Sequence, residues 1–314
     1  MKFKSLVVLC TVAFLGLACS KSSGSSADDF DAVAQEIKDD AAILTYFDAH
    51  YLHSDGEIWT IGEKEGAAPV ENQIPLAELV SVQKVTLKDI EYKLYYLKTA
   101  DGTGAAPTKV DSVFATYRGS LLDSTIFDSG AGARWFDMLK FLPGWSNGFT
   151  NFNAGEVVIN LDDSFYFENS GAGWLFFPSG LGYRNKSKGL IPENSPLIFK
   201  IELMAVNTSD HDNDGIATKD EDLDKDGNIY NDDTDGDNVP NFADVDDDGD
   251  GVRTRNEDIN KDGDFTNDDT DEDGIPNYLD NDDDGDGILT INESETNDDD
   301  EDGIPDYLDK DPVD

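Results

Sequence analysis

The C-terminal third of this 314-residue chain repeats one aspartate-rich pattern, which limits what the segment can fold into. Three similar stretches, DNDGIATKDEDLDKDGN, DGDGVRTRNEDINKDGD and DGDGILTINESETNDDD, begin at residues 212, 248 and 284. Residues 208–314 hold about 42 of the 68 acidic residues, and therefore most of the net charge of −45. Such a segment repels nucleic acid and anionic lipid, so we expect its partners to be cations.

Each repeat contains loops of about twelve residues with the ligand spacing of a calcium site. Carboxylates stand at alternate positions, glycine provides the sharp turn, and a final carboxylate closes the loop. In the three loops that glutamate closes, the predicted ligands are Asp210, Asp212, Asp214 and Glu221; Asp246, Asp248, Asp250 and Glu257; and Asp282, Asp284, Asp286 and Glu293. In the loops that aspartate closes, they are Asp222, Asp224, Asp226, Asp233, Asp235, Asp237, Asp244, Asp258, Asp262, Asp269, Asp271, Asp273, Asp280, Asp298, Asp300, Asp302 and Asp309. The sequence thus predicts structural Ca²⁺ in the repeats.

The flanking amphipathic helices of an EF-hand are missing from these repeats. The phrases DEDGIPNYLDNDDDGDG and DEDGIPDYLDKD instead resemble thrombospondin type 3 repeats of bacterial surface proteins. The alternative is a disordered acidic tail that only aids solubility. Random acidity would not keep glycine in register, and so few apolar residues cannot order the chain without metal. We therefore expect residues 207–314 to be extended without calcium and a semi-rigid rod with it.

The first residues have the pattern of an export signal. Residues 1–18 combine a basic start with a short apolar run, too short to span a bilayer of ~30 Å. LGLAC resembles the lipobox of bacterial lipoproteins, although Leu15 stands four residues before Cys19 rather than three. The expected result is an outer-membrane lipoprotein of the bacterial envelope, similar to those of Bacteroidetes and anchored through Cys19; an ordinary signal peptide is the alternative. Cys10 leaves with the signal, so no disulfide is expected within one mature chain.

The rest of the chain divides into three predicted segments. Residues 19–29 are a Ser/Gly-rich tether. Residues 30–89 form an extension that begins with an amphipathic helix over 30–50 and contains a strand at 57–61. Residues 90–206 carry strand patterns such as YKLYYLKT, DSVFATY, GWLFF and PLIFKIELMA, around one short helix marked by Trp145, Phe149 and Phe152. The fold class is α+β, an antiparallel sheet wrapped on one helix, followed by repeats with little regular secondary structure.

Aromatic residues at the turns of residues 90–206 resemble, in order and spacing, the FKBP-type peptidyl-prolyl cis-trans isomerase family. The motifs are TYRG, IFDSG, FLPGW, PSGLGY, LIP and PLIF. By this resemblance, the pocket residues are Tyr117, Phe127, Asp128, Phe141, Leu142, Trp145, Tyr183, Ile191 and Phe199. The resemblance implies an isomerase that needs no cofactor and acts on proline-containing polypeptides.

Prolyl isomerisation is a rotation about the amide bond and breaks no bond. Its barrier of ~18–20 kcal/mol arises because amide resonance is lost as the bond twists. A catalyst needs only to bind the twisted amide better than the planar forms. Trp145 would receive the proline ring, while the backbone N–H near Leu142 and the hydroxyl of Tyr183 would hold neighbouring carbonyls. Asp128 would orient Tyr117 rather than transfer a proton. We therefore expect a flat pH profile.

The sequence departs from the family pattern at three places. The extra stretch NLDDSFYFENSGAG lengthens a hairpin, expected near the pocket mouth. Trp135 is expected where the family has a pocket phenylalanine, with Phe136 as the alternative. Arg184 follows Tyr183 where glycine is usual. Two other functions stay open: a non-catalytic FKBP-fold chaperone or docking module, and a calcium-dependent surface adhesion protein.

Overall fold

The computed structural model describes residues 30–62, 64–65, 68–69, 73–130, 132–293 and 297–310. The predicted signal peptide, Cys19 and the tether lie outside these residues. The helices are α1 (Ala32–Ala49) and α2 (Pro143–Phe149). The strands are β1 (His50–Leu52), β2 (Ile58–Thr60), β3 (Lys64–Glu65), β4 (Ala68–Pro69), β5 (Ser81–Leu87), β6 (Ile90–Ala100), β7 (Ser112–Ser120), β8 (Ile126–Ser129), β9 (Arg134–Asp137), β10 (Glu156–Ile159), β11 (Phe165–Glu168), β12 (Gly171–Phe177) and β13 (Leu197–Asn207). Neither helix has the length and apolarity that a bilayer crossing requires, as far as the described residues go.

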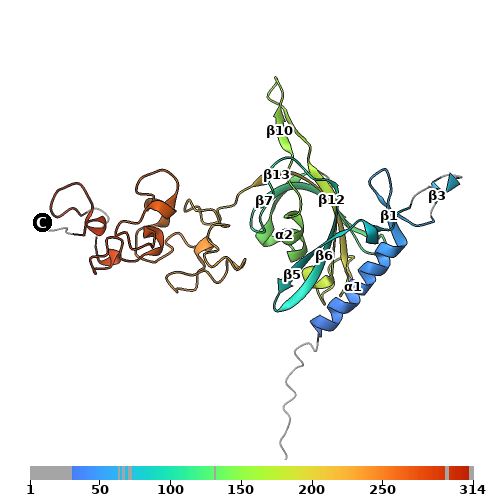
Figure 1. Ribbon diagram of the computed structural model, residues 1–314, viewed down its shortest axis with the longest axis horizontal. Coiled ribbons are helices and arrows are strands. Elements are labelled where there is room, and N and C mark those ends of the chain that lie inside the picture. Colours follow the sequence, from blue (N-terminus) through green and yellow to red (C-terminus); the bar gives the residue numbers. More distant parts are fainter. Residues whose placement is uncertain are drawn as a thin grey trace, which may run out of the picture. The chain divides into compact units, whose positions relative to one another are not determined.

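One seven-stranded antiparallel sheet forms the centre of the isomerase-like domain (Figure 1). The strand order is β5-β6-β12-β13-β7-β8, and β9 also pairs with β7. Along β7 the burial alternates residue by residue, which places Val113, Ala115 and Tyr117 on the inner face. The curved sheet wraps around α2 (Figure 1), in agreement with the predicted α+β class.

Helix α2 packs closely against the inner face of the sheet. Its N-cap is Leu142, and Pro143 begins the helix at a position where a missing N–H costs nothing. Gly144 and Gly148 share one face, and a Cβ at either would lie within 2.6 Å of Phe177 or Leu175 side-chain atoms. The absence of side chains here lets the helix approach β12, and this close approach fixes the height of Trp145 above the sheet.

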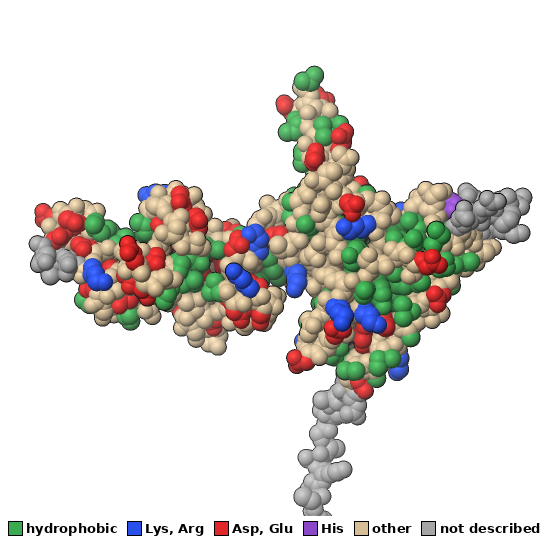
Figure 2. Space-filling view, viewed as in Figure 1, with side chains coloured by type: hydrophobic (Ala, Val, Ile, Leu, Met, Phe, Trp, Pro, Cys, Tyr) green, Lys and Arg blue, Asp and Glu red, His purple; other side chains and the backbone are tan. Residues whose placement is uncertain are grey.

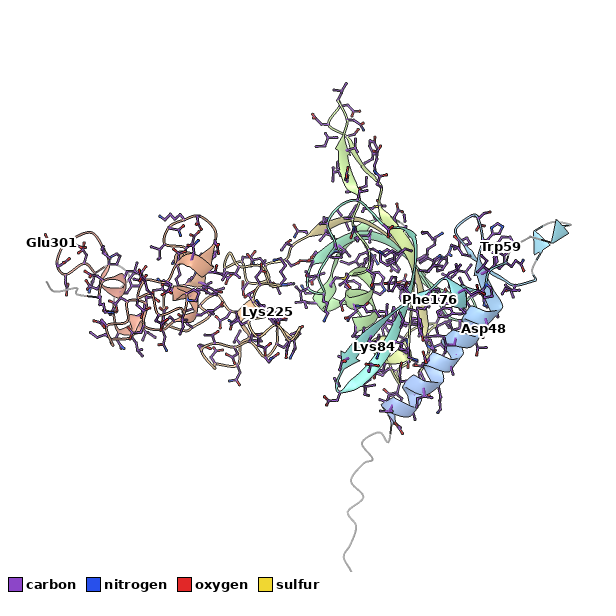
Figure 3. All side chains as sticks on the ribbon, viewed as in Figure 1. Asp48, Trp59, Lys84, Phe176, Lys225 and Glu301 are labelled. Atoms are coloured by element: carbon purple, nitrogen blue, oxygen red, sulfur yellow. The ribbon has the colours of Figure 1, made fainter. Side chains whose placement is uncertain are left out.

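Helix α1 covers the opposite face of the same sheet. Its Ile43 and Phe47 are buried against Trp174 and Phe176 of β12. The Phe47 and Phe176 rings meet edge to face with centroids 4.9 Å apart. Figure 3 labels Phe176 on the sheet. Both faces of β12 are covered, with Leu175 and Phe177 on the α2 side. This explains why its sequence contains the unbroken apolar run WLFF instead of alternating apolar and polar residues.

Two predictions about this domain need correction. The sheet begins at β5, earlier than the predicted boundary at residue 90, because β5 pairs with β6 through a tight turn at Lys88 and Asp89. Only Val85 of β5 is buried, so the strand leaves little apolar signal. The inserted hairpin β10–β11 projects from the domain (Figure 1) and does not line the pocket. Its Phe167 packs on Phe114, on the outer side of β7.

The repeats contain only short 3₁₀ turns among residues 208–293 and 297–310. These turns are Asn241–Ala243, Thr254–Asn256, Phe265–Asn267, Asn277–Leu279, Thr290–Asn292 and Asp306–Leu308. Glycines at the sixth loop position, such as Gly215 and Gly251, have φ of +112° and +99°, values that favour glycine. In the loop that begins at Asp233, Asn238 takes this position with φ +78°. Figure 2 shows acidic side chains spread over the surface of the repeats.

Candidate functional site

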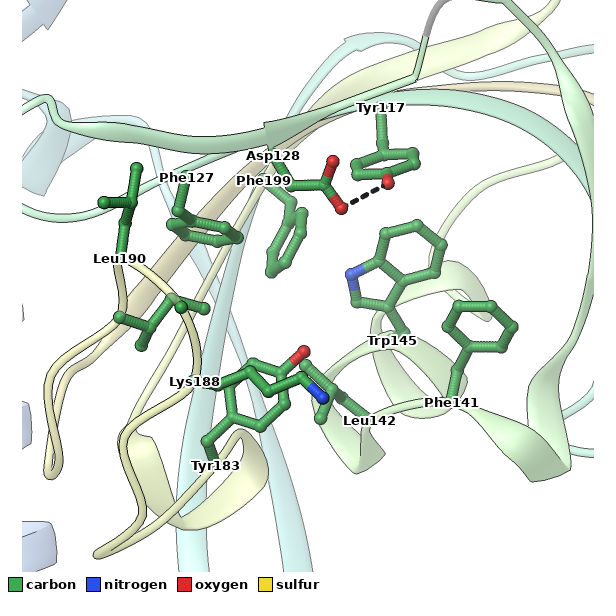
Figure 4. Close-up of a pocket in the computed structure, with 12 residues that line it drawn as sticks. Tyr117, Phe127, Asp128, Phe141, Leu142, Trp145, Tyr183, Lys188, Leu190 and Phe199 are labelled. Atoms are coloured by element: carbon green, nitrogen blue, oxygen red, sulfur yellow. Dashed lines mark hydrogen bonds between the residues drawn. The ribbon is translucent and has the colours of Figure 1, made fainter.

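All nine predicted pocket residues line one cavity of about 270 Å³ in the isomerase-like domain. Figure 4 shows them on the sheet, on α2 and on the loop after β12. The cavity is lined by more apolar than polar surface, and it opens to solvent. Three residues that were not among the predicted site residues also line the cavity: Lys188, Gly189 and Leu190, of which Leu190 lies in the LIP motif. They belong to the same loop as Ile191, whose tight turn at Gly189 was the available signal.

The floor of the pocket is the buried indole of Trp145. Its ring stacks on Phe141 at a centroid distance of 5.4 Å and meets Phe199 edge to face at 5.3 Å. The indole Nε1 is buried and has no hydrogen-bond partner among the residues that the structure describes. Because buried polar atoms are usually paired, this N–H is available to a ligand in the pocket.

A short polar chain lies along one wall. The hydroxyl of Tyr117 donates to Asp128 Oδ2 at 2.6 Å (Figure 4). Arg134 Nη2 donates to the same hydroxyl at 2.9 Å. Burial and the neighbouring Asp128 carboxylate raise the pKa of Tyr117 to about 12. The tyrosine therefore stays protonated at neutral pH and holds Asp128 at the rim.

Phe136, and not Trp135, occupies the pocket side of β9, so the expectation for Trp135 was wrong. Phe136 is 2% exposed and its ring lies 5.0 Å from that of Trp145. Trp135 is 52% exposed and contacts Phe114 on the outer face. Neighbouring side chains of a strand point to opposite faces of the sheet. Only one of Trp135 and Phe136 can therefore face the pocket.

Tyr183 and the loop that follows it form the opposite wall. Figure 4 shows the Tyr183 hydroxyl directed into the pocket, and burial raises the pKa of this residue above its usual value. Lys188 and Ile191 exchange two backbone hydrogen bonds of 2.9 Å, with Gly189 at φ +59° in the turn. Arg184 adopts φ +56°, so the turn keeps the left-handed backbone that glycine usually provides.

The repeats bring carboxylates together in several clusters. In one, ligand oxygens of Asp248, Asp250, Glu257 and Asp283 lie within 4.8 Å of one another, and all four residues are buried. A second joins Asp214, Glu221 and Asp247 in the same way. Further clusters unite Asp210, Asp212 and Asp214; Asp222, Asp224 and Asp232; and Asp233, Asp235 and Asp237. Position 1 of each loop also accepts the N–H of position 6, as Asp210 does from Gly215 at 3.3 Å.

Several of these buried carboxylates lack partners among the described residues. Both side-chain oxygens of Glu257, Asp283, Glu221 and Asp247 are without a hydrogen bond. Burial, reinforced by neighbouring negative charges, raises the pKa of Glu257 to about 11 and that of Asp283 to about 9. Several buried carboxylates this close together cannot all stay ionised at neutral pH unless bound protons or a cation compensate their negative charge. Hard oxygen ligands in this number fit calcium.

Asp247 and Asp283 were missed by the loop pattern. Each stands at the second position of its own loop, where its side chain joins the cluster of the preceding repeat. Asp232 was missed as well: it groups with Asp222 and Asp224, whereas the predicted closing residue Asp233 belongs to the next cluster. The available signal was the doubling of aspartate wherever one loop ends and the next begins.

The fold and the pocket define a small α+β domain with an open, mostly apolar cavity between its sheet, α2 and the loop after β12. Residues 104–204 match the family model described as FKBP-type peptidyl-prolyl cis-trans isomerase. Residues 211–267 and 250–298 each match a model described as BamM C-terminal. The chain is 31% identical over 107 residues to FK506-binding protein 1 of Aspergillus oryzae, covering 34% of this chain and 91% of that protein. The chain belongs to the FKBP-type peptidyl-prolyl cis-trans isomerase family.

Bacterial relatives are similar over the same domain. The chain is 33% identical over 150 residues to FkpA of Aeromonas hydrophila, covering 46% of this chain and 50% of that protein. It is 36% identical over 110 residues to outer membrane protein MIP of Legionella longbeachae, covering 33% and 40%. The crystal structure of FkpA from Escherichia coli matches at 30% identity with a TM-score of 0.31, over 36% of this chain and 48% of that chain. The chain thus spans about half the length of these relatives or less.

Proposed function

We propose that the chain catalyses the cis–trans isomerisation of peptide bonds that precede proline, in other polypeptides. The observation that supports this most is the single cavity in which Trp145, Tyr183 and Asp128 face a common apolar space. Membership of the family supports the reaction, and the geometry of the pocket supports the roles proposed here for its residues. The proline ring would rest on Trp145, with Phe199 beside it and the Tyr183 hydroxyl donating to a carbonyl of the bound peptide.

The pocket would favour the twisted amide in two ways. Rotation removes charge separation from the amide carbonyl, so an apolar, partly desolvated site stabilises the twisted form relative to the planar ones. The Tyr183 hydroxyl fixes the chain beside the rotating bond, which lowers the entropy that rotation must lose. The Tyr117–Asp128 pair holds the rim in place. No proton has to move.

The direct test is a prolyl isomerisation assay on a model peptide with the full chain. The proposal expects acceleration that Tyr183→Phe lowers, because only the donated hydrogen bond is removed. A folded wild-type protein that binds the peptide and does not accelerate rotation would contradict the proposal and support the docking module instead.

The rate is expected to be flat between about pH 6 and 9, since no step transfers a proton. The raised pKa of Tyr117, about 12, keeps its hydroxyl protonated over this range, because a raised pKa extends the protonated form to higher pH. The raised pKa of Tyr183 acts in the same direction. Measuring kcat/KM across the range checks this; a bell-shaped profile would indicate general acid–base catalysis.

We also infer that the repeats bind calcium. The support comes from the cluster of buried carboxylates at Asp248, Asp250, Glu257 and Asp283. Within the described residues, neither side-chain oxygen of Glu257 or of Asp283 has a hydrogen-bond partner. These residues would hold the ion, which would supply the positive charge that their burial requires. Titration of the full chain with calcium in a calorimeter tests this inference. Heat equal to that of dilution would contradict it. The thrombospondin type 3 resemblance remains a prediction.

We further propose that the protein works in the bacterial envelope, held by a lipid at Cys19, where it assists the folding of exported proteins. The sequence supports this through its export signal and lipobox, and one relative is named an outer membrane protein. Mass spectrometry of the protein from membranes would detect acylation at Cys19. A mature chain whose Cys19 carries no lipid, or one cut after Cys19, would contradict the anchor.

A further inference from the structure

A buried carboxylate on α1 reaches across the domain to the turn before Tyr183. Asp39 is 2% exposed, and its Oδ2 accepts hydrogen bonds from Ser179 N at 2.8 Å and Ser179 Oγ at 2.6 Å. Its other oxygen accepts from Gln35 Nε2 at 2.6 Å. Ser179 is itself 1% exposed and begins the 3₁₀ turn η3 (Ser179–Leu181). The carboxylate therefore has partners on both oxygens, and it joins segments 140 residues apart.

The same serine holds the backbone on both sides of Tyr183. The carbonyl of Ser179 accepts from Gly182 N at 2.9 Å and from Arg184 N at 2.8 Å. Arg184 in turn has φ +56°, and its carbonyl accepts from Asn194 N at 2.7 Å. The position of Tyr183 is thus fixed through its two neighbours, and both depend on where Ser179 lies.

The turn cannot shift toward the sheet. Gly180 packs so closely against the ring of Tyr92 in β6 that a Cβ on Gly180 would be 2.1 Å from the ring. Tyr92 therefore blocks movement of the turn toward the sheet, and the hydrogen bonds from Ser179 to Asp39 tie the turn to α1. Burial raises the pKa of Asp39, and its hydrogen bonds with Ser179 partly offset this rise. Keeping a carboxylate in such a place is costly, so a specific structural role is expected.

We propose that Asp39 is a positioning residue for the pocket: by fixing Ser179, it sets the place of the Tyr183 hydroxyl. Helix α1 lies outside residues 104–204, the part that matches the family model, so this control comes from the chain's own N-terminal extension. The effect on turnover rests on the proposed isomerase function. The effect on the turn does not, because it concerns backbone geometry alone.

The first experiment compares hydrogen exchange in Asp39→Asn and Asp40→Asn. Asp40 is the matched control, since it also ties α1 to the sheet. It accepts hydrogen bonds from Lys93 Nζ at 2.7 Å and from the Tyr95 hydroxyl at 2.6 Å, both donors in β6 rather than in η3. We expect the Gly182 and Arg184 amides to exchange about tenfold faster in Asp39→Asn only, because their acceptor becomes mobile. Equal exchange in wild type and a folded Asp39→Asn would overturn the proposal, whether or not the protein is an isomerase.

The second experiment is a double-mutant cycle on kcat/KM. Asp39→Asn is expected to lower kcat/KM about tenfold, and Asp40→Asn less than about twofold. In a Tyr183→Phe background, Asp39→Asn should add little, since its effect passes through the missing hydroxyl. Fully multiplicative effects would show that Asp39 acts on stability alone and would overturn the positioning role. Absence of turnover in wild type would contradict the proposed function, and hydrogen exchange would still decide the proposal.

Discussion

Chelating calcium is expected to disorder residues 208–310 and to leave the isomerase domain folded. Without a cation, clusters such as Asp248, Asp250, Glu257 and Asp283 contain several buried like charges, and opening the loops returns them to water. Hydrogen exchange is the measurement. The Thr254 and Thr290 amides, bonded to Val245 and Asn281 carbonyls, should lose at least about 100-fold protection, while β7 and β13 keep theirs.

Single variants sharpen this prediction. Glu257→Gln removes a buried charge from the proposed calcium site and should weaken calcium binding about tenfold, or ~1.4 kcal/mol. Glu272→Gln is the matched control, because Glu272 is exposed and belongs to the same array. Protection that is the same with and without chelator would exclude calcium as the source of order. Full exchange under both conditions would favour the disordered acidic tail.

Replacing Trp145 by alanine is expected to lower kcat/KM roughly 100-fold, or ~2.7 kcal/mol of transition-state stabilisation. The indole is 3% exposed, and it is in contact with the rings of Tyr117, Phe136 and Phe199. Its loss removes the floor on which the proline ring would rest, and stability should fall by ~3–5 kcal/mol. Activity is measured at a temperature where circular dichroism shows the variant folded.

Trp174→Ala separates the pocket from general stability. Trp174 is also 3% exposed, but it lies on the α1 side of the sheet, with Arg118 and Lys200 against its ring. Its removal should lower the free energy of unfolding by a similar amount, ~3–5 kcal/mol. The value of kcat/KM should fall less than about threefold. Equal losses of activity in the two variants would contradict the assignment of Trp145 to the site.

The sequence was sufficient to find the pocket because its residues lie in short motifs. Tyr117 of β7, Trp145 of α2 and Tyr183 after the turn Ser179–Leu181 each have a glycine within two residues, so the motifs can be recognised from the sequence alone. The choice between Trp135 and Phe136 failed for the opposite reason: a slip of one residue along a strand exchanges its faces, and only packing against Trp145 decides it.

Long-range contacts were beyond the sequence patterns. Asp39 meets Ser179 across 140 residues, and nothing in the helical pattern around it distinguishes a ligand of the turn from a solvent-exposed acid. Asp283 was missed because a calcium loop was treated as closed on itself, whereas the structure gives Glu257 a neighbour from the next repeat. In both cases the missing information is which elements pack together.

Helix α1 covers one face of β12, and this limits how far the domain can be truncated from its N-terminal side. A fragment that begins at residue 90 would uncover Trp174, Phe176 and Ile198, three side chains now at most 3% exposed. An aromatic patch of this kind promotes self-association at concentrations used for crystallisation or NMR. The smallest soluble unit should therefore start near residue 30, and aggregation of shorter fragments would reflect the lost helix rather than a defective fold.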